Sequence, residues 1–142
     1  MDYSTLLIWD REDAPPNGEC IKVLWRSFGG RQNTTHSIPD YIEEYSDELK
    51  SRFLACVHEL GETQIDGKSL VNHLKLRPGF SYWWMTLLSE KCNAIKSPQI
   101  DNAIKLLAFK DWLSDRNYKE ILFISSNSTL AEAVSLLSKN LG

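Results

Sequence analysis

The sequence predicts an α/β fold: a partial Rossmann-like layered domain with a small sheet of about three or four strands and several helices. Short apolar runs at 5–9, 20–26 and 121–124 are typical of buried strands. Longer stretches between them carry apolar residues every three or four positions, as amphipathic helices do. The last strand-like run leads through capping residues into a helix, a unit expected in the middle of a doubly wound domain.

Composition and length narrow the possible classes of protein. The chain has 142 residues, which predicts a single α/β domain over 1–142. Its 16 basic and 19 acidic residues give a net charge of −3, which argues against nucleic acid as a partner. The three cysteines lack any CxxC pair or metal spacing, so they predict reduced thiols of a cytoplasmic protein. We expect no cofactor, no metal and no transmembrane segment, and contact with a membrane from its periphery stays open.

The two N-terminal strands are expected to be neighbours. Residues 10–19 connect them and contain two prolines and the turn pair Asn17-Gly18. A parallel crossover usually contains a helix, which needs at least about ten to twelve residues, so this connection favours an antiparallel pair.

Helices are expected in the centre of the chain. Ser37 can cap a helix with Pro39 in its first turn. An apolar stripe then continues to Gly61, which fits the position after a helix C-terminus. The stripe consists of Ile42, Tyr45, Leu49, Phe53, Cys56 and Leu60. A short helix is predicted over 69–76.

The C-terminal third predicts a helix, a strand and a second helix. Ser97-Pro98 begins a helix whose apolar stripe reaches Trp112. A strand follows over 121–124 and a helix over 130–140, with Thr129 and Glu132 at the spacing of a capping box. A thin parallel sheet needs neighbours at its edges. We therefore expect a second copy at the open edge, or a longer protein of which these residues are the N-terminal portion.

Two loops are candidate anion sites. The turn at 125–129 places hydroxyls, among them that of Ser126, at a helix N-terminus. Gly29 and Gly30 permit close approach of a ligand, and Arg31 can form paired hydrogen bonds with a phosphate. Both loops also have a purely structural interpretation, because Ser, Thr and Asn are the preferred capping residues and Gly-Gly is common in turns.

The densest aromatic stretch, 80–88, admits three interpretations: a filled core, a sugar-stacking surface or a protein interface. Trp83 and Trp84 are adjacent and must point in different directions on a helix. One can pack in the core while the other lines a cleft or a partner surface.

Other polar residues give weaker signals. Asp10, Glu12 and Asp13 form an acidic loop at a strand end, where general bases often lie. His73 lies beside basic residues and could act as an acid or base, although a lone histidine is more often structural. His58 has no second histidine four positions later, so the helical zinc pattern fails.

Residues 74–91, LKLRPGFSYWWMTLLSEK, continue to Ser97-Pro98 and to IKLLA at 104–108. This pattern resembles a family of bacterial surface carbohydrate biosynthesis proteins, glycosyltransferase-type proteins of O-antigen loci. The resemblance implies that this chain is similar to the N-terminal, acceptor-side part of a longer protein. It supplies no catalytic residue to carry over and implies that the isolated chain has little or no transferase activity.

The leading hypothesis is therefore an acceptor-side domain that binds a carbohydrate or lipid-linked glycan. Its expected binding residues are Gly29, Gly30, Arg31, Trp83 and Ser126. The alternative is a non-catalytic module that docks a partner protein through exposed tryptophans. A third hypothesis, a small nucleotide binder, is weakened because the glycine fingerprint is missing.

Overall fold

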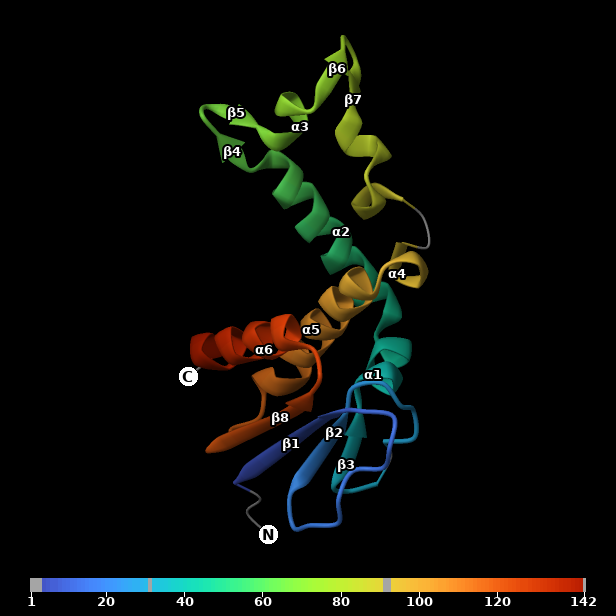
Figure 1. Cartoon of the computed structure of the whole chain (residues 1–142), viewed down its shortest axis with the longest axis vertical. Coiled ribbons are helices and arrows are strands. Elements are labelled where there is room, and N and C mark those ends of the chain that lie inside the picture. Colours follow the sequence, from blue (N-terminus) through green and yellow to red (C-terminus); the bar gives the residue numbers. More distant parts are fainter. Residues whose placement is uncertain (1–3, 31, 91–92, 142) are drawn as a thin grey trace. The chain divides into compact units, whose positions relative to one another are not determined.

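The computed structural model describes residues 4–30, 32–90 and 93–141 (Figure 1). The sequence predicts one domain, whereas the structure divides the chain into two compact units. The first, which we name the sheet unit, combines residues 1–46 with 105–142. The second, the insert unit, is the continuous stretch 47–104.

The sheet unit contains a four-stranded parallel sheet in the order β3-β2-β1-β8. Its strands are β1 (Thr5–Asp10), β2 (Ile21–Leu24), β3 (Thr35–Ser37) and β8 (Glu120–Ser125). Helices pack against this sheet, so the predicted α/β Rossmann-like layered fold is confirmed.

The antiparallel pairing expected for the first two strands is wrong. Leu6 lies opposite Ile21 and Trp9 opposite Leu24, so β1 and β2 run in the same direction. Ten extended residues can span roughly 33 Å, whereas a strand of β1's length measures roughly 20 Å. The connection is therefore long enough to bring the chain back to the amino-terminal end of β1. There β2 can begin parallel to β1 without an intervening helix.

The edge strand β3 lies where the sequence predicts no strand. Its three residues pair with β2, with Lys22 opposite Thr35 and Leu24 opposite Ser37. The strand has no apolar run, because its residues Thr35, His36 and Ser37 are polar although Ser37 is buried and the other two are half-buried.

Three helices contribute to the sheet unit: α1 (Ile38–Glu44), α6 (Ser128–Leu141) and the C-terminal part of α5 (Pro98–Ser114). Ser37 caps α1 as predicted, with its Oγ accepting from the backbone N–H of Asp40. The cap of α6 is Asn127 rather than the predicted Thr129, since Asn127 Oδ1 accepts from Leu130 N at 3.1 Å.

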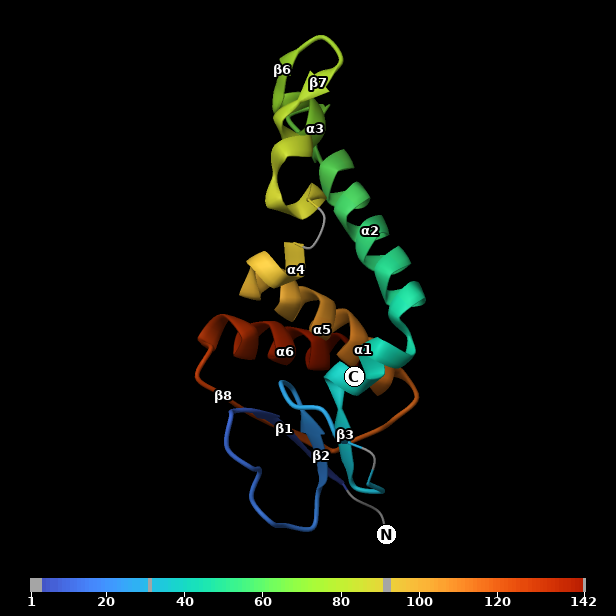
Figure 2. The ribbon, with the colours of Figure 1, turned by 90° about the vertical axis from the view of Figure 1, so that its right-hand side faces the viewer.

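The helices cover one face of the sheet (Figure 2). On that face Leu6, Ile8 and Val23 are buried, together with Phe109 of α5 and Val134 of α6. The loop that follows β1 lies on the other side of the strands. On that side Leu122 and Ile124 of β8 are exposed.

Trp25 is the largest side chain at the centre of this core. It follows β2, is fully buried, and meets the rings of Phe109 and Phe123 edge-on, each at 6.0 Å between centroids. Trp25 therefore joins the sheet to α5.

The insert unit is built from helices and two small hairpins. Its elements are α2 (Ser46–Glu62), β4 (Gln64–Ile65), β5 (Lys68–Ser69), α3 (Leu70–His73), β6 (Lys75–Arg77), β7 (Phe80–Ser81), the 3₁₀ turns Tyr82–Met85 and Leu87–Ser89, and α4 (Asn93–Lys96). The paired strands β4–β5 and β6–β7 are both antiparallel.

Two helix boundaries in this region differ from the prediction. The long helix expected from Ser37 to Gly61 is broken at Tyr45, and Gly61 lies inside α2. A Cβ atom at Gly61 would lie 3.0 Å from Val71 Cγ2, so glycine here permits close packing and does not end the helix. The helix expected over 69–76 ends at His73, and the following residues form β6.

Candidate functional site at the carboxyl ends of the strands

The strand order of the sheet unit creates a switch point between β1 and β8. From β1 the chain proceeds to β2 and β3 on one side, and the later strand β8 joins on the opposite side. In open parallel sheets, ligands bind outside the carboxyl ends of the strands at such a point. The residues at the carboxyl ends of β1, β2 and β8 therefore form the candidate site.

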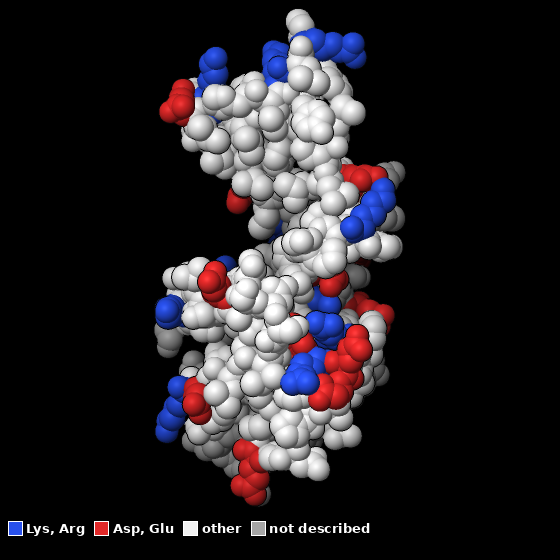
Figure 3. All heavy atoms as spheres, in the orientation of Figure 1, with Lys and Arg blue, Asp and Glu red and all other residues white. Residues whose placement is uncertain are grey.

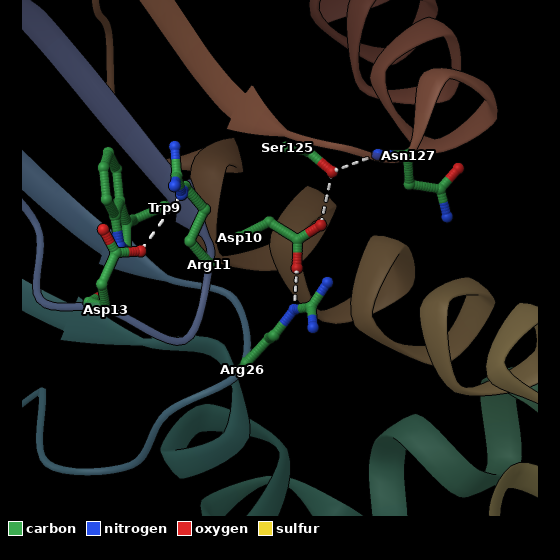
Figure 4. Close-up of polar contacts among 7 residues, drawn as sticks. All are labelled: Trp9, Asp10, Arg11, Asp13, Arg26, Ser125 and Asn127. Atoms are coloured by element: carbon green, nitrogen blue, oxygen red, sulfur yellow. Dashed lines mark hydrogen bonds and ion pairs between the residues drawn. The ribbon is translucent and has the colours of Figure 1, made fainter.

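One buried carboxylate connects these three strand ends (Figure 4). Asp10, the last residue of β1, is 3% exposed and lies opposite Ser125, the last residue of β8. Its Oδ2 accepts from Ser125 Oγ at 2.5 Å, and its Oδ1 accepts from Arg26 Nε at 2.6 Å. Both carboxylate oxygens thus have a donor, as burial of the charge requires.

Arg26 is the cation of this group. The hydrogen bond that Arg26 donates to Asp10 raises the pKa of Arg26, so the guanidinium stays charged. Its side chain is 44% exposed, and its terminal amino groups have no hydrogen-bond partner among the residues that the structure describes. Asp10 therefore fixes one side of the guanidinium and leaves the other side free for an anion.

The start of α6 borders the same group. Asn127 donates its backbone N–H to Ser125 Oγ at 2.9 Å, which connects the Asp10 carboxylate to the first turn of the helix. Ser126 is exposed between them. The positive end of the α6 dipole and the Ser126 hydroxyl both favour an anionic or hydroxyl-bearing ligand here.

These residues line an open cleft of about 660 Å³. Its lining consists of Asp10, Arg11, Glu12, Asp13, Arg26, Ile124, Ser125 and Ser126. Arg11 makes a more exposed pair of the same kind. Its Nε donates to Asp13 Oδ1 at 3.1 Å, both side chains are more than half exposed, and its guanidinium lies 5.7 Å from the centre of the Trp9 ring. The cleft thus offers guanidinium groups held through Nε, hydroxyls, and exposed carboxylates that can accept from sugar hydroxyls.

Of the four predicted binding residues that the structure describes, only Ser126 lines this cleft. Trp83 belongs to the insert unit and is 3% exposed, so its ring fills the interior of that unit. The neighbouring Trp84 points outward and is 60% exposed. Arg31 lies outside the described residues.

Gly29 and Gly30 have a structural role in the loop before β3. Both backbone N–H groups donate to Asp40 Oδ2 at 2.9 Å, so a carboxylate of the protein already occupies these donors. Gly29 has φ +95°, which favours glycine. A Cβ at Gly30 would lie 2.2 Å from the backbone carbon of His36, so no other residue fits without backbone movement.

We expect Gly30→Ala to lower the free energy of unfolding by about 1–3 kcal/mol, because the added methyl group meets backbone and not a flexible side chain. Urea unfolding followed by circular dichroism measures the change. Gly18→Ala is the control, since nothing lies within 4 Å of a Cβ at Gly18. Equal stability of the two variants would contradict the close approach.

The sequence indicated Asp10 only as part of an acidic loop and missed Arg26. The available signal was a charged residue at the end of each of two strand-like runs. That signal becomes informative only when the strands are parallel, because parallel strands bring their carboxyl ends to one edge.

A second cavity of about 630 Å³ lies beside β3 and α1. His36 and Trp112 meet there with ring centroids 5.1 Å apart, and the Arg116 guanidinium lies 4.4 Å from the Trp112 ring. Burial, and secondarily the charge of Arg116, lowers the pKa of His36 below its ordinary value. His36 is therefore neutral near pH 7.

This lowered pKa predicts a stability that falls as the pH falls. Below about pH 6.5 the unfolded chain binds a proton at His36 more readily than the folded chain does. The free energy of unfolding that His36 contributes should thus decrease between about pH 7.5 and 5.5. Urea titrations at several pH values give the free energy of unfolding of the wild type and of His36→Gln. The excess stability of the wild type over the variant should shrink as the pH falls through this interval. A constant difference would contradict the prediction, and exposed His58→Gln is the control.

His73, considered as an acid or base, is an exposed residue of the insert unit whose Nε2 bonds to the carbonyl of Ile65 at 2.6 Å. Among the described residues, no group of three His, Cys, Asp or Glu side chains is arranged to hold a metal. No helix within the described ranges is long and apolar enough to cross a bilayer.

Comparison with known proteins finds no matching family model, no matching curated protein and no matching solved structure.

Proposed function

We propose that the sheet unit binds a phosphorylated sugar, such as the phosphate-linked sugar of a lipid-linked glycan, at the carboxyl ends of β1, β2 and β8. In this proposal the chain is the acceptor-side domain of a glycosyltransferase-like protein of surface polysaccharide biosynthesis. The broader assignment rests on the sequence resemblance. The binding assignment rests on the cleft.

A single observation carries the binding proposal: Asp10, buried at the switch point, holds Arg26 with its terminal amino groups uncommitted among the described residues. An arginine oriented by a buried carboxylate loses little entropy when it binds a phosphate. Ser126 and the start of α6 add a hydroxyl and a helix dipole on the same side of the cleft. The exposed carboxylates of Glu12 and Asp13 can accept hydrogen bonds from a sugar ring.

Titration of the full chain with glucose 1-phosphate, UDP-glucose and inorganic phosphate tests this proposal. Trp9 lies under the Arg11 guanidinium at the cleft, so its fluorescence should change as the cleft fills. We expect saturable binding that Arg26→Gln weakens by about tenfold, the usual effect of losing a charge-assisted hydrogen bond. Lys110→Gln, an exposed residue of α5, matches the charge change and should leave binding unaltered.

Absence of saturable binding by all three probes would refute the sugar-phosphate site. Equal affinities of Arg26→Gln and the wild type would also refute it. If inorganic phosphate bound as tightly as glucose 1-phosphate and UDP-glucose, the cleft would be an anion site that does not recognise the sugar.

The second candidate is a binding or assembly module without catalysis. The exposed ring of Trp84 favours it, because a large exposed aromatic side chain is typical of an interaction surface. This candidate does not require the cleft to bind sugar.

A further inference from the structure

A short segment of the insert unit exposes several large apolar side chains. We name residues 75–87 the tip segment; it comprises β6, β7 and the 3₁₀ turn that follows. Five of its apolar residues are more than one-third exposed: Leu76, Tyr82, Trp84, Met85 and Leu87. Single exposed apolar residues are ordinary on protein surfaces, but five within thirteen consecutive positions form a concentrated apolar surface.

The local structure directs these side chains outward. Ser81 Oγ accepts from Trp83 N at 3.2 Å and donates to the carbonyl of Val71 at 2.6 Å. Thr86 Oγ donates to the carbonyl of Trp83 at 2.7 Å. These bonds hold the 3₁₀ turn with Trp83 buried, so the adjacent Trp84 and Met85 must point away from the interior.

Between Asp66 and Glu90 the chain carries only basic charged side chains. Residues 67–89 contain Lys68, Lys75 and Arg77 and no Asp or Glu, although the chain as a whole is acidic. Figure 3 shows Lys and Arg atoms gathered where the β6–β7 hairpin lies. The Arg77 guanidinium lies 5.4 Å from the ring of Phe80, which keeps its charge beside the apolar side chains.

We propose that the tip segment docks on the surface of an anionic lipid membrane. Trp and Tyr favour the boundary between headgroups and acyl chains, while Leu and Met side chains enter the apolar layer. Lys68, Lys75 and Arg77 would attract anionic headgroups at the same depth, since each long side chain can extend towards them. Charge complementarity favours a membrane over a second copy of this chain, because two copies would bring like charges together.

This proposal does not depend on ligand binding at the cleft, because the tip segment and the cleft belong to different units. Vesicle binding without sugar binding would therefore support the membrane proposal and refute the sugar site. Sugar binding without vesicle binding would do the opposite.

The test is cosedimentation of the full chain with vesicles of pure phosphatidylcholine and with vesicles containing roughly one-third phosphatidylglycerol. We expect binding to the anionic vesicles that weakens when the salt concentration is raised. The double variant Lys75→Gln/Arg77→Gln should bind about 25-fold more weakly, because each charge near an anionic surface contributes about fivefold. Trp84→Ala should also lose about tenfold.

Matched controls come from the sheet unit. Lys110→Gln/Lys119→Gln removes two exposed charges, and Leu136→Ala shortens an exposed apolar side chain of α6. Both controls should bind the vesicles like the wild type. Brominated acyl chains should quench the wild-type fluorescence and quench Trp84→Phe less, a readout that does not depend on affinity. Circular dichroism verifies that each variant is folded.

Three results would overturn the proposal. The first is failure of the wild type to bind anionic vesicles, and the second is equal binding by the tip variants and the controls. The third is a doubled mass in light scattering that Trp84→Ala abolishes, together with no vesicle binding, which would assign the tip segment to self-association.

Discussion

Trp25→Ala is expected to lower the free energy of unfolding of the sheet unit by about 3–5 kcal/mol. The fully buried indole contacts Phe109 and Phe123, so its removal leaves a cavity between the sheet and α5 and ends two edge-on aromatic contacts. A loss of this size approaches the total stability of many domains. Urea unfolding measured by far-ultraviolet circular dichroism should show a midpoint much lower than that of the wild type.

Two further variants separate packing from nonspecific effects. Trp25→Phe keeps an aromatic ring and should lose clearly less than Trp25→Ala. Trp84→Ala removes an exposed indole and should change the stability by less than about 0.5 kcal/mol. If Trp25→Ala were no less stable than Trp84→Ala, the central place of Trp25 in the core would be wrong.

Asp10→Asn is expected to lower the free energy of unfolding by about 2 kcal/mol and to weaken ligand binding at the cleft. Removing one partner of a fully buried ion pair costs about 3–5 kcal/mol. Because the Arg26 side chain is 44% exposed and can turn towards water, the loss is smaller here. Urea unfolding and glucose 1-phosphate titration measure the two effects.

Asp13→Asn is the matched control for Asp10→Asn. Its carboxylate lines the same cleft and pairs with Arg11, but both side chains are more than half exposed. Exposed pairs contribute about 0–1 kcal/mol, so Asp13→Asn should be nearly as stable as the wild type. A larger loss in Asp13→Asn than in Asp10→Asn would contradict the role assigned to the buried carboxylate.

Continuous apolar runs and the stripe after Pro98 predicted the fold best. The runs that became β1, β2 and β8 were found in the sequence, as was α5, because burial on several sides leaves a strong apolar signal. The edge strand β3 and the two hairpins of the insert unit consist of strands of two or three residues without an apolar run, so they left no such signal. Strand direction was also misjudged, because an extended connection can replace a helix.

The candidate site was only partly predictable for a related reason. Ser126 was found because capping residues at a strand-to-helix turn have a local signature. The group of Asp10, Arg26 and Ser125 joins three strands and depends on which strands are neighbours. For the adjacent tryptophans the sequence predicted that one is packed and the other points outward. Trp83 is buried and Trp84 is exposed, whereas the sequence analysis had expected Trp83 to contact the ligand.

The pairing of β1 with β8 has a consequence for synthesis on the ribosome. This pair of strands can form only after Glu120, the partner of Thr5, has been synthesised 115 positions later. At about 5–20 residues per second, the nascent chain carries Leu6 and Ile8 without their final neighbours for roughly 6–23 s. Residues 47–104 are complete well before then, so the insert unit can collapse first. We expect the emerging N-terminal strands to be the part of this chain that most needs a chaperone during translation.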